Sequence, residues 1–178
     1  MADWKPGTTL AENPLFYEDM TPEGTALMDT VNKELIAIGD KLEQNGIPSR
    51  IPHIFDFLAK YVYKDPCSNL QDFFSKNDAY KGFRCPLKQQ DNGEWAPDFG
   101  NRYFTEDIPL GLCIYKGVAD LVGVATPAMD EIITWASRYM GKAYLEGGKL
   151  SGKDVVETNA PQKFGITSLD GLKKRYQE

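Results

Sequence analysis

The segment NRYFTEDIPLG, residues 101–111, places an arginine and two acidic residues at the start of an apolar run. A guanidinium group binds a carboxylate through two parallel hydrogen bonds, so Arg102 is a candidate for holding a small charged ligand. Thr105 is of the residue type that begins helices, and the free N–H groups of a first turn over Glu106 and Asp107 would add to an anion site. The segment therefore predicts a carboxylate-binding site with Arg102, Thr105 and Glu106 as candidate substrate-binding residues.

A second interpretation of the same residues needs no ligand. Acidic side chains in a first helical turn are stabilised by the helix dipole, and Pro109 is tolerated there because its missing donor costs little. Under this interpretation Arg102 and Asp107 pair with each other and begin a helix. The local pattern leaves both interpretations open.

Helical patterns account for most of the chain. The predicted helices cover residues 21–46, 51–65, 67–80, 105–121 and 126–140, followed by short pieces near 151–157 and 168–176. The first begins with Thr21 as N-cap and Pro22 in the first turn, and Gly46 ends it. The second carries aromatic residues on several faces, which predicts a well-buried helix. Thr126 and Pro127 repeat the helix-start pattern of the first helix.

The fold class that follows is all-α, with one domain spanning residues 1–178. Residues 1–20 form an irregular lead-in, and residues 147–178 form a Gly-rich turn with short terminal helices. Asn92-Gly93 is a hairpin signal, so a small β-hairpin is expected near residues 83–99. The alternation of strands and helices that a nucleotide-binding sheet requires does not occur.

Composition excludes several function classes. The 178 residues are 42% hydrophobic and carry a net charge of −6, with a sequence pI of about 4.9. Nucleic acids and anionic membranes need clustered Lys and Arg, so neither is an expected partner. No apolar run approaches the roughly 18 residues of a membrane span. The chain shows no secretory signal, and its three cysteines lack a CxxC pair, which favours free thiols in the cytoplasm.

Familiar catalytic and binding motifs are missing. GxGxxG does not occur, and Gly147, Gly152 and Lys153 have phosphate-loop spacing but are followed by Asp154 where that loop requires Ser or Thr. One histidine and three scattered cysteines cannot supply a metal site. His53 is expected to be a packing or capping residue. No cofactor-binding or metal-binding residue is predicted on this chain.

Several segments, in order, resemble the C-terminal helical domain of the opine (octopine/nopaline) dehydrogenases. They are NPLFYEDMTPEGTALMDTVNKELIAI, HIFDF, NDAYKGFRCPLK, RYFTEDIPLGLCIYKGVADLVGVATPAMDEIITWASRYMGKAYL and GGKLSGKDVVETNAPQKFGITSL. The likeness covers nearly the whole chain, and the RYFTEDIP cluster is its most specific part.

The resemblance implies an oxidoreductase that condenses an amino acid with an α-keto acid such as pyruvate and reduces the imine with NADH or NADPH. In such enzymes a Rossmann domain holds the cofactor, and a His–Asp pair handles protons. At the matching positions, the resemblance gives Arg102 the role of binding the carboxylate of the keto acid. It assigns the acid that orients the catalytic histidine to Asp107, which is therefore the candidate catalytic residue.

The sequence departs from this pattern in one respect. The N-terminal Rossmann domain and the catalytic histidine precede the point at which this sequence begins, and His53 aligns elsewhere. The cofactor, NAD or NADP, is therefore expected on a separate domain or subunit, and the chain is expected to be inactive alone. It could be a fragment, a split-gene subunit, or a non-catalytic ligand-binding or dimerisation module. The face that a Rossmann domain would cover is expected to be partly apolar, so the chain could form a homo-oligomer through it. Candidate residues of that face are Trp4, Tyr17 and Trp95.

Overall fold

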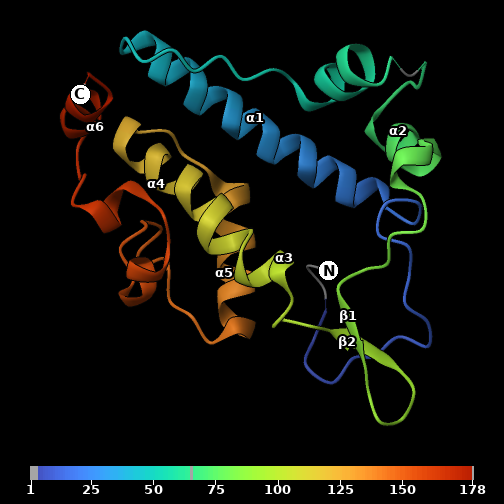
Figure 1. The fold of residues 1–178 in the computed structure, drawn as a ribbon. Helices are drawn as coiled ribbons and strands as arrows, with labels where there is room; N and C mark the ends of the chain where they lie inside the picture. The colour runs from blue at the N-terminus through green and yellow to red at the C-terminus, as the bar shows by residue number, and fades with distance from the viewer. Residues whose placement is uncertain (1–3, 65, 178) are drawn as a thin grey trace. The chain divides into compact units, whose positions relative to one another are not determined.

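The computed structural model describes residues 4–64 and 66–177. The chain divides into two compact units, one made of residues 1–29 and 54–101, the other of residues 30–53 and 102–178. The helix α1 (Pro22–Gln44) contributes to both units (Figure 1). Apart from one two-stranded hairpin, the regular elements of the described residues are helical, so the all-α prediction is confirmed.

The elements of each unit follow in chain order. The first unit holds η1 (Asp56–Val62, π-helical), α2 (Leu70–Lys76), the 3₁₀ turn η2 (Asp78–Tyr80), β1 (Leu87–Gln89) and β2 (Trp95–Pro97). The second holds α3 (Arg102–Thr105), η3 (Ile108–Leu112, π-helical), α4 (Cys113–Val122), α5 (Pro127–Met140), the 3₁₀ turns η4 (Lys153–Glu157) and η5 (Pro161–Phe164), and α6 (Leu169–Gln177). Within the described residues no helix combines the length and apolar character needed to cross a membrane.

The start and end of α1 follow the predicted signals. The Thr21 hydroxyl accepts a hydrogen bond from the N–H of Gly24 at 3.1 Å, which satisfies one of the free donors of the first turn. Gly46 has φ +83°, a conformation in which a side chain would be strained, and it lies just beyond the last helical residue. Local sequence alone therefore fixes both ends of this helix.

The expected hairpin is present, with a longer loop than a two-residue turn. Leu87 pairs with Pro97 and Gln89 with Trp95 in an antiparallel ladder. Asn92 and Gly93 lie inside the connecting loop, where Gly93 has φ +86° and the Asn92 side chain accepts a hydrogen bond from the N–H of Glu94. The Asn-Gly pair thus marks the position of the turn.

An aromatic cluster forms the core of the first unit. Its buried members are Ala59, Leu70, Phe73 and Phe74, and the rings of Tyr17 and Tyr80 pack against it. The Tyr17 ring stacks on Phe74 with centroids 5.3 Å apart. Tyr17, which was a candidate for the apolar face, is therefore partly buried against this core.

The second helix is not well buried, contrary to the prediction. Its aromatic and aliphatic side chains divide between the core and the surface: Leu58 packs inward, whereas Phe57, Val62 and Tyr63 are exposed and Tyr61 is 73% exposed. The backbone is π-helical, so residues five apart share hydrogen bonds and the apolar residues spread around the axis. Residue types alone could not show which of these faces would be covered.

Two apolar clusters make the core of the second unit. One joins α1 to α4 and α5 through Ile38, Leu42, Ala119, Val122 and Met129. The other packs η3, α4 and α5 against the C-terminal segment, with these buried members: Ile108, Cys113, Ile133, Ala136, Tyr144, Leu150, Val155 and Ala160. The α5 members of these clusters, Met129, Ile133 and Ala136, recur at helical spacing on one face, and the two clusters together hold η3 in place.

The N-terminus of α5 is capped from a distance. Thr126 occupies the cap position, but its side chain makes no cap hydrogen bond. Instead the buried carboxylate of Glu34, on α1, accepts hydrogen bonds from the N–H groups of Ala128 at 2.7 Å and Met129 at 3.0 Å. The capping role predicted for Thr126 therefore belongs to Glu34, because a carboxylate satisfies two donors and also matches the helix dipole.

Replacing Glu34 by alanine should destabilise the protein by about 2–4 kcal/mol, because two buried N–H groups lose a charged acceptor. Urea unfolding followed by circular dichroism measures the change. Glu43→Ala, on an exposed position of the same helix, is the matched control and should stay within about 0.5 kcal/mol of the unsubstituted protein. Equal stabilities for the two variants would refute the capping role.

Candidate functional site

The predicted site residues occupy the beginning of a broken helix. Arg102 is the first residue of α3, Thr105 is its last, and Glu106 and Asp107 form the turn that precedes η3. The helix thus begins three residues earlier than predicted. Pro109 supplies no N–H to the carbonyl four residues before it, so the helix cannot continue regularly there.

The corrected helix start changes the local chemistry. The N–H groups of Glu106 and Asp107 both donate to the Arg102 carbonyl, at 2.8 and 3.3 Å. They are therefore not free donors for an anion, and Thr105 is not an N-cap. The positive charge that this segment offers to an anion is the Arg102 guanidinium.

Arg102 forms an exposed ion pair along the helix. Its Nη2 lies 3.1 Å from Oε2 of Glu106, and the two side chains are 77% and 49% exposed. Pairs of this kind contribute little because water screens both charges. A guanidinium has five N–H donors, so most of its hydrogen-bonding capacity is left for another carboxylate.

Asp107 has no structural role in the described part of the chain. It is exposed, makes no cap hydrogen bond and has no side-chain partner there, Arg102 and His53 included. The interpretation in which Arg102 and Asp107 pair with each other is therefore wrong, because Arg102 pairs with Glu106. An acid that caps nothing and pairs with nothing is available to a ligand or to an added imidazole.

The same segment is anchored from beneath. Phe104, Ile108 and Pro109 are buried, and Phe104 lies beside Trp135 of α5 with ring centroids 6.1 Å apart. The outward side carries Tyr103 and Leu110, both exposed apolar side chains near the charged groups. Buried and exposed positions alternate at helical spacing, so the core fixes which side of the segment carries the charged groups.

A buried charge network lies in the same unit and was not predicted. Lys116 of α4 is 3% exposed, and its Nζ contacts Oδ1 of Asp130 at 2.8 Å, Oδ1 of Asp120 at 3.2 Å and the Thr126 hydroxyl at 3.3 Å. Asp120 also accepts the Leu150 N–H at 2.8 Å. The four-residue spacing of Lys116 and Asp120 on one helix was the available sequence signal. The network joins α4, α5 and the C-terminal segment.

Other sites for catalysis or cofactor binding are not formed by the described residues. Burial raises the pKa of the Cys113 thiol to about 12 and also raises that of Cys85, so both stay protonated and weakly nucleophilic. No cluster of metal-ligating side chains occurs among these residues. The Gly152 and Asp154 N–H groups donate to Tyr144 and Ala143 carbonyls, so they are not available to a phosphate. The sheet of the described residues is a single two-stranded hairpin, so these residues do not form the parallel sheet of a dinucleotide-binding fold.

Comparisons with known proteins agree with the fold. Residues 4–140 match the family model described as NAD/NADP octopine/nopaline dehydrogenase, alpha-helical domain. Tauropine dehydrogenase of Arabella iricolor is 37% identical over 175 residues, which cover 96% of this chain and 44% of that protein. Octopine dehydrogenase of Mizuhopecten yessoensis is 37% identical over 172 residues, covering 93% and 42%.

A solved structure gives the same result. Octopine dehydrogenase with NADH and pyruvate superimposes with a TM-score of 0.83 at 35% identity, covering 96% of this chain and 42% of that one. The chain therefore spans less than half the length of the relatives it matches. Since the family model covers most of the chain and the relatives match it almost throughout, the chain belongs to the octopine/nopaline dehydrogenase family and corresponds to its alpha-helical domain.

Proposed function

We propose that this chain is the substrate-binding helical domain of an NAD(P)H-dependent opine dehydrogenase, which joins an amino acid to an α-keto acid such as pyruvate by reductive condensation. The observation that carries the proposal is the exposed, unpartnered carboxylate of Asp107 on the same short segment as a weakly paired guanidinium. Neither side chain makes a buried ion pair or a helix cap that would stabilise the fold. A guanidinium and a free carboxylate are the groups that binding a keto acid and transferring a proton require.

Each residue has a stated role in the proposal. Arg102 holds the keto-acid carboxylate through its guanidinium, and Glu106, which already accepts one of its N–H groups, keeps the fork in place. Thr105 is an exposed residue of the same segment and is proposed to contact the bound substrate. Asp107 accepts a hydrogen bond from an imidazole that another part of the complete enzyme supplies, and so fixes the tautomer that takes a proton from the substrate amine.

The proposal places reduction on a partner domain or subunit, since the sheet of the described residues is a single two-stranded hairpin without the alternating strands and helices of a dinucleotide-binding fold. Residues 1–178 then act as one substrate domain that orients the two reactants for condensation. The chain alone should show no NADH oxidation with pyruvate and an amino acid. A hybrid enzyme, in which this chain replaces the matching region of Mizuhopecten yessoensis octopine dehydrogenase, should show it. Activity of the chain alone would contradict this division of roles, and an inactive but folded hybrid would contradict the proposed function.

Arg102→Ala in the hybrid enzyme should raise the pyruvate KM about 10–100-fold with little change in kcat, because it removes charged hydrogen bonds made before and during the reaction. Arg102→Lys should give an intermediate KM, since one ammonium cannot replace a planar fork. Arg138→Ala, an exposed arginine of α5, is the matched control and should leave KM unchanged. An unaltered KM in Arg102→Ala would remove Arg102 from the site.

One observation favours a second candidate, a non-catalytic ligand-binding or dimerisation module. The exposed aromatic side chains of η1, Phe57 and Tyr61 among them, form an apolar surface that a partner could cover. Analytical ultracentrifugation of the chain distinguishes the two. A stable dimer that Tyr61→Ser dissociates, together with an inactive hybrid enzyme, would favour the module.

A further inference from the structure

The chain contains two Asn-Gly pairs, Asn45-Gly46 and Asn92-Gly93, which the fold holds in different surroundings. Glycine after asparagine favours deamidation, because its backbone nitrogen can reach the side-chain carbon of the asparagine without hindrance from a Cβ. The reacting pair is the same at both positions, so a difference between them must come from the surrounding structure.

Asn45-Gly46 is fixed at the end of α1. The Asn45 side-chain amide donates to the Lys41 carbonyl at 2.8 Å. The Gly46 N–H donates to the Glu43 carbonyl at 2.9 Å, and the next residue, Ile47, is buried. Attack by the Gly46 nitrogen needs rotation of the backbone at this pair, so it needs the last turn of α1 to open.

Asn92-Gly93 lies in the exposed loop between β1 and β2. Oδ1 of Asn92 accepts a hydrogen bond from the Glu94 N–H at 3.0 Å, which stabilises the negative oxygen that forms when a nucleophile attacks the side-chain carbon. The Gly93 N–H donates to the Gln90 carbonyl at 2.9 Å, within the same loop. Freeing this nitrogen therefore requires only a local opening of the loop.

We propose that Asn92 is a site of spontaneous deamidation. The Gly93 nitrogen loses its proton to a solvent base and bonds to Cγ of Asn92, and the side-chain nitrogen takes up a proton from water and leaves as ammonia. Water then adds to either carbonyl of the resulting cyclic imide and breaks one of its C–N bonds, so residue 92 becomes aspartate or isoaspartate. One water enters and one ammonia leaves, and no oxidant or cofactor takes part.

The new carboxylate breaks a link between the hairpin and the N-terminal segment, residues 9–13. Oε2 of Glu94 accepts hydrogen bonds from the Thr9 hydroxyl at 2.5 Å and from Nδ2 of Asn92 at 2.8 Å. These bonds, that from Thr9 first, lower the pKa of the Glu94 carboxyl, so it is ionised at neutral pH. Deamidation replaces the Asn92 donor by a second anion, which repels Glu94 and releases Thr9.

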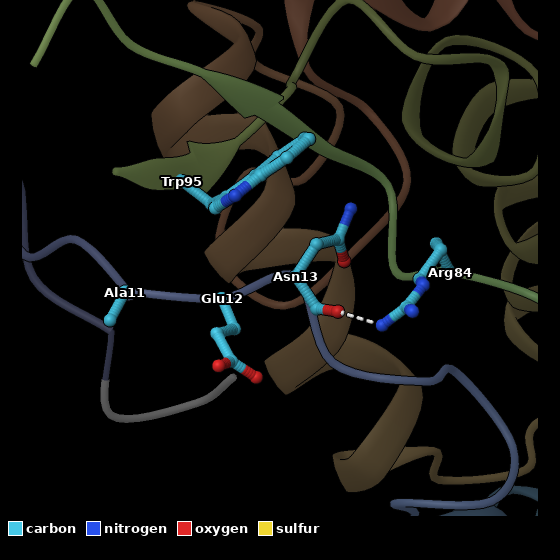
Figure 2. A pocket seen from close by; sticks show the side chains of 5 residues that line it. All are labelled: Ala11, Glu12, Asn13, Arg84 and Trp95. Atoms are coloured by element: carbon cyan, nitrogen blue, oxygen red, sulfur yellow. Dashed lines mark hydrogen bonds between the residues drawn. The ribbon is translucent and has the colours of Figure 1, made fainter. Parts of the chain in front are cut away.

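The release is confined to one end of the N-terminal segment. Leu10 follows Thr9 directly, and its N–H donates to the Trp95 carbonyl at 2.8 Å. At the other end, beside the pocket drawn in Figure 2, the Arg84 guanidinium donates to the Asn13 carbonyl at 2.5 Å. Loosening at Thr9 should therefore appear first as faster hydrogen exchange of the Leu10 N–H.

The first test compares the two Asn-Gly pairs in one sample. The chain is incubated at mildly alkaline pH, and mass spectrometry of the tryptic peptides 42–50 and 89–102 follows the replacement of each amide by a carboxylate. Asn92 should react at least about tenfold faster than Asn45, because the loop opens more easily than the helix end. In urea the two rates should agree within about threefold, because the unfolded chain removes this difference. Equal rates in the folded chain, or the same tenfold ratio in urea, would overturn the proposal.

The second test uses Asn92→Asp, which carries the charge of the product. By NMR, the Leu10 N–H should exchange at least about threefold faster in this variant than in the parent. Asn92→Ser removes the amide without adding charge and should give a smaller increase, and Asn45→Asp should give none. Unchanged exchange in Asn92→Asp would refute the release of the N-terminal segment.

A double variant tests the repulsion itself. In a Glu94→Gln background, Asn92→Asp should no longer accelerate exchange of the Leu10 N–H, because no second anion faces the new carboxylate. The same acceleration with and without Glu94 would rule out like-charge repulsion as the cause. None of these measurements depends on catalysis or on Arg102, so their outcome is independent of the proposed function.

Discussion

Asp107→Asn lowers kcat of the hybrid enzyme by about 10²–10⁴-fold while the pyruvate KM stays nearly constant, because the amide cannot stabilise a protonated imidazole. The carboxylate has no structural partner in the described residues, so the variant should melt at the same temperature as the parent. The separation is informative, since a loss of activity without a loss of stability points to chemistry. Steady-state NADH oxidation and a thermal melt measure the two quantities.

The control for this result is Asp170→Asn, an exposed acid of α6 whose side chain forms no ion pair or hydrogen bond within the described residues. It should leave kcat and the melting temperature unchanged. If Asp107→Asn kept kcat within about threefold of the parent, Asp107 would be a solvated surface acid. The proposed function would then rest on Arg102 alone.

Lys116→Met should have the largest effect on stability, a loss of about 3–5 kcal/mol. Lys116 is the buried cation between Asp120 and Asp130, and its removal leaves two carboxylates facing each other with little water to screen them. Breaking a buried ion pair from one side leaves an uncompensated charge, which costs more than the pair itself contributes. Urea unfolding monitored by circular dichroism and by tryptophan fluorescence would give the difference.

Lys149→Met is a matched control because it approaches the same Asp120 oxygen, at 3.5 Å, from solvent. Its side chain is 66% exposed, against 4% for Lys116. Exposed pairs contribute about 0–1 kcal/mol, so this variant should remain close to the parent. Similar losses for the two lysines would show that burial does not set the strength of this network.

Local signals predicted the elements whose ends depend on one residue. Thr21 and Gly46 set the ends of α1, and Asn92-Gly93 marked the hairpin. These are short-range effects of backbone conformation and hydrogen bonding, so a window of a few residues contains them.

The local geometry of the candidate site segment differs from the prediction. The sequence singled out Arg102, Glu106 and Asp107, and the structure places them on one short exposed segment. The pairing differed, since Arg102 contacts Glu106, one helical turn on, and leaves Asp107 free. The helix begins at Arg102, three residues before the predicted start at Thr105. The earlier start places Arg102 itself in the helix, where it shares a face with the residue four positions on.

The sequence by itself determined that this chain is helical, that it carries the residue pattern of the opine dehydrogenases, and which segment holds its candidate catalytic groups. Tertiary structure alone decided that Glu34 caps α5, that Lys116 is buried between two acids, and that the aromatic helix η1 lies half in solvent. The physical reason is range: caps, turns and periodicity act within a few residues. Burial and charge pairing depend instead on contacts between segments as far apart as residues 34 and 128.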